Sequence, residues 1–161
     1  MDDSKSKSSK DVDIYRDTPV RLLGYANEVG ESFRAKIGPR WVLATYGLST
    51  AYVIADTIDK SIKTYNKSKV NGDQIEKTAY AATDAFIWQM LASVLVPGFT
   101  INRACALSNY MLSKNVNLKA SRREWLVICI GICVIPFIIK PIDHSMDKLM
   151  DNTLRKLYTL E

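Results

Sequence analysis

Three long stretches of the chain carry no charged side chain and are rich in large apolar residues. They span residues 41–55, 85–102 and 125–139, and charged residues bound each of them on both sides. Random placement of the charges would give roughly 0.6 runs of this length. The pattern therefore predicts about three apolar helices, with the charged residues confined to the rest of the chain.

These runs are shorter than a typical membrane-spanning helix. A span needs roughly 20 residues, whereas 15 residues cover only about 22 Å at a rise of 1.5 Å each. Two interpretations stay open: buried core helices of a soluble bundle, or short spans whose flanking basic side chains reach the interface. The candidates for that role are Arg40, Lys60, Arg103 and Lys140. Small residues at every fourth position allow close helix contact in either setting; they are Gly47, Ala51 and Ala55.

An amphipathic helix is predicted over residues 18–36, ahead of the first run. Thr18 and Pro19 suit the N-cap and the first helical position, and Gly38-Pro39 ends the segment. The apolar residues share one face at spacings of three and four; they are Leu22, Tyr25, Ala26, Val29, Phe33 and Ile37. We expect this helix to lie on a membrane surface or to dock on the other helices.

The middle of the chain is divided by turn-forming residues. A second helix is expected over 40–64 and a third over 74–96, with a surface loop at 66–73. Pro97-Gly98 is expected to break the third helix, so that a segment over 99–113 follows at a changed angle.

The two ends of the chain differ in character. Residues 1–13 hold little to bury and read as a disordered tail, so that 14–161 form a single helical domain. A basic linker, 113–124, precedes the last apolar run, where Pro136 and Pro141 predict kinks. Beyond them a second amphipathic stripe is formed by Ile142, Met146, Leu149, Met150, Leu154 and Leu157.

An internal echo suggests a degenerate duplication. Five residues recur at a constant offset of 84 positions, and the pairs are Trp41 with Trp125, Gly47 with Gly131, Ile58 with Ile142, Asp59 with Asp143, and Ser61 with Ser145. Two halves built from a short helix and a Trp-led apolar helix would explain the offset, as in many membrane folds.

Average composition alone describes a mildly basic soluble protein. The mean hydropathy is −0.07, 24% of residues are charged and the formal net charge is +5. These values exclude a disordered chain and a disulfide scaffold, since 47% of residues are hydrophobic and only three are cysteine. The charge distribution changes the picture, because basic residues gather in 60–77 and 103–124, beside the apolar runs, where anionic lipid headgroups would meet them. If both lie on opposite sides of a membrane, they give no orientation.

Little in the sequence suggests catalysis. His144 has no nucleophile context, and Cys129 and Cys133, four residues apart, do not make a zinc set, so we expect them to be buried as small hydrophobes. Phosphate-binding loops are absent, and basic residues lack interleaved aromatics. We therefore expect no enzyme activity, no metal, no cofactor and no nucleic-acid partner.

Charged residues at the edges of the apolar runs are more informative. They are Asp56, Asp59, Asp84, Arg103, Lys140 and Asp143. In lipid such groups pair, snorkel or serve function, but each also suits a helix cap or the headgroup level. Asp143 fits an N-cap, and a direct pair of Asp84 with Arg103 requires the break at Pro97-Gly98 to fold the chain back.

Several strings of the chain resemble a known family. These are YRDTPVRLLGYANEVGESFR (15–34), YVIADTIDK (52–60), DAFIWQMLASVLVPGFTINR (84–103) and PIDHSMDKLMDNTLRKLY (141–158). In order and without a large gap, they look like the mitochondrial fission process protein 1 family, also called the mitochondrial 18-kDa protein. The resemblance implies a multi-pass protein of the mitochondrial inner membrane that is required for organelle fission, with no catalytic residues.

We therefore expect an all-α, polytopic membrane bundle that acts as a membrane-shaping or partner-recruiting scaffold. The partners expected are membrane lipids, in particular anionic ones, and this protein itself or other inner-membrane proteins. A small channel or a modulator of a carrier or proton leak is the alternative, with Asp56, Asp84, Arg103 and Lys140 facing a polar path. Candidate interaction residues are Arg21, Tyr25, Asn27, Glu28, Gly30, Asp84, Pro97, Gly98, Arg103 and Asp143.

Overall fold

Helices form all the regular structure in the computed structural model, whose described residues are 19–68, 74–114 and 118–159. The elements are η1 (Pro19–Tyr25, 3₁₀), α2 (Ala26–Lys67), α3 (Gln74–Gln89), η3 (Met90–Leu95, π), α4 (Val96–Ser113), α5 (Ala120–Asn152) and α6 (Leu154–Thr159). The all-α prediction is confirmed. The predicted tail, 1–13, and most of the predicted loop at 66–73 lie outside the described residues.

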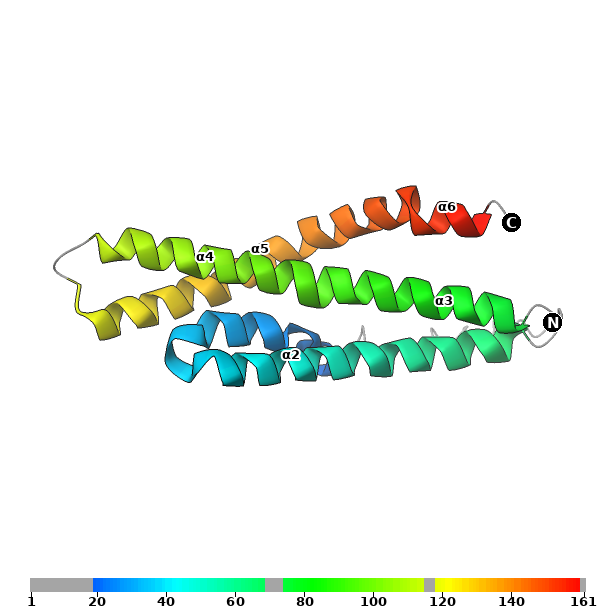
Figure 1. Ribbon diagram of the computed structural model, residues 1–161, viewed down its shortest axis with the longest axis horizontal. Coiled ribbons are helices and arrows are strands. Elements are labelled where there is room, and N and C mark those ends of the chain that lie inside the picture. The colour runs from blue at the N-terminus through cyan, green and yellow to red at the C-terminus, as the bar shows by residue number, and fades with distance from the viewer. Residues whose placement is uncertain (1–18, 69–73, 115–117, 160–161) are drawn as a thin grey trace, which may run out of the picture.

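Gly38 divides α2 into two antiparallel arms. Its φ of 77° and ψ of 167° lie in a region that suits glycine, and Pro39 follows at the start of the next arm. The short arm comprises η1 and residues 26–37, and the long arm comprises residues 39–67 (Figure 1). The predicted end of the first helix at Gly38-Pro39 is confirmed, although its first turns are 3₁₀ rather than α.

The predicted break at Pro97-Gly98 is wrong. Residues Gln74–Ser113 form one continuous helix of 40 residues, because α3 passes through the π-helical turn η3 directly into α4 (Figure 1). Pro97 sits in the first turn of α4, and the wider π-turn before it absorbs the missing N–H. Residues 99–113 therefore continue the same rod. Pro136 and Pro141, where kinks are predicted, lie inside α5.

The helices pack as a small bundle in which the short arm of α2 is covered on several sides. Figure 1 shows the short arm folded back along the long arm, the α3–η3–α4 rod beside both, and α5 crossing that rod obliquely. Two small apolar clusters stabilise these crossings: Ile101, Cys105, Val127 and Ile135 between α4 and α5, and Tyr52, Val53 and Val94 between α2 and η3.

Three glycines allow the short arm to approach its neighbours closely. A Cβ on Gly30 would clash with the Thr45 hydroxyl of the long arm, and one on Gly98 would clash with the Tyr46 hydroxyl. A Cβ on Gly131 of α5 would lie 2.6 Å from Ser32 Oγ. The predicted small-residue face behaves differently, because Gly47 has no neighbour within 4 Å and Ala51 is exposed.

Many large apolar side chains are exposed on the outside of the bundle. Exposed large hydrophobic residues outnumber buried hydrophobic ones among the described residues, and Phe137 of α5 is 79% exposed. Cys129 and Cys133 are also exposed, so the prediction that they are buried is wrong. Of the predicted C-terminal stripe, Ile142 and Met150 are buried, whereas Leu149 is exposed.

Two helices are long and apolar enough to cross a bilayer. They are Gln74–Ser113 and Ala120–Lys156, and only 33% and 17% of their most apolar 18-residue windows is buried. Core helices of a soluble protein pass the same test of length and composition but are mostly buried. The expectation of about three such helices is therefore corrected to two for the described residues, since the run at 41–55 lies in α2, which does not qualify.

We predict opposite effects of alanine at two helical glycines of α2. Gly30→Ala should destabilise the fold by about 1–3 kcal/mol, because the added methyl overpacks the contact with Thr45. Gly47→Ala should be neutral or stabilise by up to about 1 kcal/mol, because its site is open and alanine favours helix. Thermal unfolding of the purified protein in detergent measures both, and equal effects at the two positions would contradict this packing.

Candidate functional site: a buried polar network and a charged pocket

The short arm of α2 buries its polar face and exposes its apolar one. Asn27, Glu28, Glu31 and Ser32 are at most 3% exposed, whereas Leu22, Leu23 and Val29 on the other side are at least 43% exposed. The sequence predicted that the apolar stripe would meet a membrane or the other helices. In the structure Leu22, Val29 and Ile37 of that stripe are exposed, whereas Tyr25, Ala26 and Phe33 are half-buried. The polar face makes the hydrogen bonds to the rest of the chain.

Asn27 ties the beginning of the short arm to two other helices. Its backbone N–H, one of the unpaired donors at a helix start, donates to Ser49 Oγ over 3.1 Å, and the Ser49 hydroxyl donates to Asn27 Oδ1 over 2.9 Å. The Asn27 side-chain amide donates to the Val94 carbonyl of η3 over 2.9 Å. Ser49 of the long arm therefore caps the helix of the short arm, although the two residues are 22 positions apart in the sequence.

Glu31 collects hydrogen bonds from three directions. Arg34 donates twice to its carboxylate, over 2.6 Å each, and Asn102 of α4 donates over 2.8 Å. The Tyr46 hydroxyl of the long arm adds a fourth bond over 3.0 Å. Burial alone would raise the pKa of Glu31, but the bonds from Arg34, Asn102 and Tyr46 outweigh it and lower that pKa. The group is therefore a satisfied buried anion.

Glu28, one turn earlier on the same face, has the opposite environment. Its side chain is completely buried, and neither carboxyl oxygen has a hydrogen-bond partner. Burial raises the pKa of Glu28 to about 8, so the carboxyl is mostly neutral at pH 7. Two glutamates three residues apart thus hold different charges because only one of them has donors.

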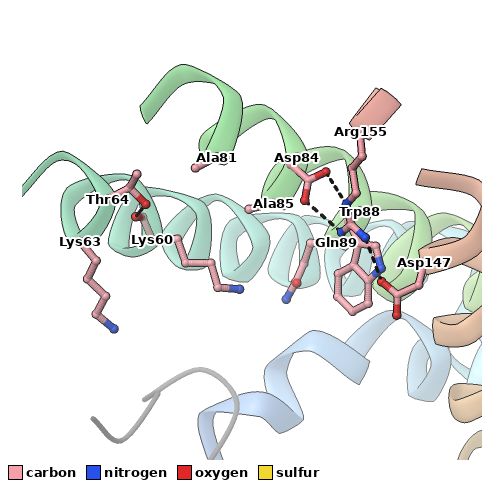
Figure 2. A pocket seen from close by; sticks show the side chains of 10 residues that line it. All are labelled: Lys60, Lys63, Thr64, Ala81, Asp84, Ala85, Trp88, Gln89, Asp147 and Arg155. Carbon is pink, nitrogen blue, oxygen red and sulfur yellow. Dashed lines mark hydrogen bonds and ion pairs between the residues drawn. The ribbon is translucent and has the colours of Figure 1, made fainter. Parts of the chain in front are cut away.

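A second polar feature lies where α2, α3, α5 and α6 meet. A pocket of about 420 Å³ is lined by charged and polar side chains of these helices, among them Lys60, Asp84, Gln89, Asp147 and Arg155. Figure 2 shows Asp84 facing the Arg155 guanidinium, which donates to both carboxylate oxygens over 3.0 Å. Arg155 also donates to Asp151 over 2.7 Å. This ion pair fastens α6 to α3 across 71 residues of sequence.

The structure gives the partner of Asp84 as Arg155 and not Arg103. The rod through Pro97 keeps Arg103 away, and its guanidinium instead contacts Asn102 and the ring of Phe99. The predicted N-cap role of Asp143 is also wrong, because that residue lies inside α5, which begins after Lys119.

The other predicted interaction residues lie mostly inside the bundle. Gly30, Pro97 and Gly98 are buried at helix crossings, together with Asn27 and Glu28, while Tyr25 is half-buried. The side chain of Arg21 lies outside the described residues. These positions contact other helices of the same chain; their role as surfaces for other molecules stays a prediction.

Glu31, Asn102, Tyr46 and Arg155 were not singled out from the sequence. Glu31 follows Glu28 by three residues and precedes Arg34 by three, which is the spacing of a polar helix face. A polar face with this spacing is normally predicted to face solvent. It could have been predicted to be buried only if the apolar stripe on the opposite side were already known to be exposed. In the described part of the chain, no group of three or more His, Cys, Asp or Glu side chains could hold a metal ion.

The geometry defines an all-helical protein with a buried polar network beside its apolar clusters, many exposed large apolar side chains and two candidate spanning helices. Its sequence matches the family model described as Mitochondrial 18 KDa protein (MTP18) over residues 14–80 and 64–150. The chain therefore belongs to this family and is a mitochondrial protein by homology. No solved structure matches it.

Relatives with substantial identity cover nearly the whole chain. Mitochondrial fission process protein 1 of Danio rerio is 51% identical over 162 residues, which cover 99% of this chain and 96% of the relative. The proteins of that name from Caenorhabditis elegans and Homo sapiens are 48% and 47% identical, each over 91% of this chain and 89% and 88% of their own length. None of these names denotes an enzyme.

We predict that Glu28 makes stability depend on pH. Because its pKa is 4.5 in the unfolded chain and about 8 when buried, the folded state holds a proton that the unfolded state lacks between these values. Stability should therefore fall as pH rises from about 4.5 to 8, by at most about 1.4 kcal/mol per unit, and then level off. Glu28→Gln should remove this slope, measured by denaturant unfolding in detergent at pH 5 to 8.

Glu76→Gln provides the matched control, since Glu76 is exposed on α3. That variant should keep the wild-type slope. Parallel pH profiles for the wild-type chain and Glu28→Gln would show that Glu28 is not buried as an uncharged acid.

Proposed function

We propose that this protein is a non-enzymatic, multi-pass protein of the mitochondrial inner membrane that promotes mitochondrial fission, as a membrane-shaping or partner-recruiting scaffold. Homology to mitochondrial fission process protein 1 supports the role in fission. The observation that carries membrane insertion is the inverted packing of the short arm of α2, whose polar side is buried and whose apolar side is exposed.

Exposed apolar side chains on several helices support insertion in lipid. The outer surface of α5 carries Trp125, Leu126, Ile130, Ile132 and Phe137, all of them exposed. A group of large exposed apolar side chains is costly in water and is typical of a surface that contacts lipid or protein. In lipid it costs nothing, and the buried polar network and close glycine contacts then supply the helix association.

The short arm offers a mechanism for shaping the bilayer. It is too short to span, and its outward side chains Leu22, Leu23 and Val29 would insert between lipids. Because hydrogen bonds fix the polar face to the long arm of α2, to η3 and to α4, the bundle sets how deeply these side chains insert. The open face around Gly47 and Ala51 offers a close-packing surface for a second helix of a partner or of another copy.

The alternative, a polar path through the protein, receives less support. Asp84 is held by Arg155, and Asp56 by Lys60 over 2.6 Å, while Arg103 and Lys140 are exposed on the outer surface. These four residues do not line one continuous path. Proton flux in liposomes that is abolished by Asp84→Asn would nevertheless favour the channel over the scaffold.

We predict that the outward face of the short arm is required for fission. Mitochondria in cells depleted of the protein should elongate, and wild-type chain should restore their length. A variant with Leu22→Asn, Leu23→Asn and Val29→Asn should fail to restore it, because the wedge becomes polar while the buried network is untouched. Fluorescence microscopy of mitochondrial length gives the measurement.

Ile75→Asn is the control, because Ile75 is 80% exposed at the beginning of α3, away from the short arm. It should restore mitochondrial length. All variants should stay in the membrane pellet after alkaline carbonate extraction; release of the wild-type chain would refute insertion, and full rescue by the triple variant would refute the wedge.

A further inference from the structure

One end of the bundle carries a group of exposed basic side chains. Arg40 begins the long arm of α2, Lys114 follows α4, and Lys119 and Arg122 lie at the start of α5. All four side chains are exposed, and no carboxylate of the described residues forms an ion pair with them. We call these four residues the basic end. Figure 1 shows that the α2 turn, the end of α4 and the start of α5 lie at the same end of the molecule.

The acidic residues near the basic end are already neutralised. Glu31 is buried against Arg34, and Glu124 is paired with Lys36 over 3.5 Å. The first turn of α5 contains no acidic residue, and its N-cap makes no side-chain hydrogen bond. The positive end of the helix dipole therefore adds to the charge of Lys119 and Arg122.

The opposite end has similar numbers of basic residues but a different balance. Lys60 pairs with Asp56 and Lys63 with Asp59, both over 2.6 Å. Arg155 is held by Asp84 and Asp151. The sequence predicted that both basic loops would meet anionic lipid and that they would give no orientation. Ion pairing distinguishes the two ends, because Lys60, Lys63 and Arg155 have carboxylate partners, whereas none of the four cations of the basic end has one among the described residues.

Exposed aromatic rings accompany the basic end. Trp41 follows Arg40 directly and is 68% exposed. Lys114 Nζ lies 4.7 Å from the centroid of the Tyr110 ring, and Lys36 Nζ lies 4.7 Å from that of Trp125. Tryptophan and tyrosine favour the headgroup region, and lysine and arginine beside them favour lipid phosphates. An acidic protein partner would explain the basic side chains but not the exposed aromatic rings beside them, so these rings favour lipid as the partner.

We propose that the basic end binds the anionic phospholipid headgroups of one leaflet and thereby sets the orientation of the protein in the membrane. The inference rests on the proposed membrane insertion. The ligand chemistry is a phosphodiester anion at the bilayer surface, bound by four uncompensated cations and framed by Trp41, Tyr110 and Trp125. By the positive-inside bias, basic loops tend not to be translocated, so this end should stay on the side of the membrane from which the protein inserts.

The test measures the lipid preference of the full chain in bilayers. Quenching of tryptophan fluorescence by brominated phosphatidylglycerol is compared with quenching by brominated phosphatidylcholine, in a Trp88→Phe background so that Trp41 and Trp125 report. The expected preference for phosphatidylglycerol is at least about threefold at low salt and decreases as salt is added. A charge-removed variant should lose it; its substitutions are Arg40→Gln, Lys114→Gln, Lys119→Gln and Arg122→Gln.

A matched control removes four charges at the other end. It carries Lys67→Gln, Lys77→Gln, Lys148→Gln and Lys156→Gln, and it should keep the preference. Arg40→Lys with Arg122→Lys should keep it as well, which separates lost charge from lost folding. Inorganic phosphate at constant ionic strength should not compete with the lipid for the basic end, because the proposed ligand is a headgroup held at the bilayer surface.

Each other outcome is distinct. Equal quenching by the two lipids in the wild-type chain overturns the lipid proposal and favours an acidic protein partner. Equal loss of the preference in both charge variants shows that it depends on total charge and overturns the assignment to the basic end. Competition by inorganic phosphate overturns the assignment to a leaflet. Absence of quenching by either lipid overturns membrane insertion itself, and so identifies a failure of the proposed function.

Discussion

The Glu31 carboxylate holds the short arm of α2 to two other segments at once. It accepts hydrogen bonds from Arg34 on its own helix, from Tyr46 on the long arm and from Asn102 on α4. Burying a carboxylate without these donors would cost the folded state several kcal/mol, so the short arm has one stable position in the bundle. That position requires glycine at 30, 98 and 131, since a side chain at any of them would hold the helices too far apart for these hydrogen bonds to form.

Fixing the polar face inward has consequences for the whole surface. The apolar side of the same arm must then face outward, beside the exposed residues of α5 and the long arm. In water this arrangement would be unfavourable, because apolar side chains would be exposed to solvent. In lipid, the hydrophobic effect gives apolar side chains little preference for the inside of the bundle over its outer surface. Polar networks and close backbone contacts then decide which faces meet. The neutral Glu28 fits this setting, because a carboxyl without donors is tolerated there only when it is protonated.

Element types and several boundaries follow from the sequence alone. The Gly38-Pro39 turn and the helical character of all three apolar runs were predictable, because they depend on local chemistry. The direction of the short arm was not, because an amphipathic stripe docks through its apolar face in water and through its polar face in lipid. The continuous helix through Pro97 was not predictable, because a break and a π-turn both follow from a missing N–H, and only packing against Asn27 and Tyr46 selects between them. The Asp84–Arg155 pair spans 71 residues and leaves no local pattern.

Disulfide cross-linking between the short arm and α4 tests the inverted packing most directly. Cys105 lies close to Ser32 at the Gly131 crossing, where a Cβ on that glycine would approach both side chains within 2.8 Å. With Cys129→Ser and Cys133→Ser in mitochondrial membranes, Ser32→Cys should form an oxidant-induced disulfide with Cys105, whereas Val29→Cys on the outward face should not. A cross-link from Val29→Cys and none from Ser32→Cys would show that the apolar face points inward, and would contradict the buried polar face of the short arm on which the scaffold proposal depends.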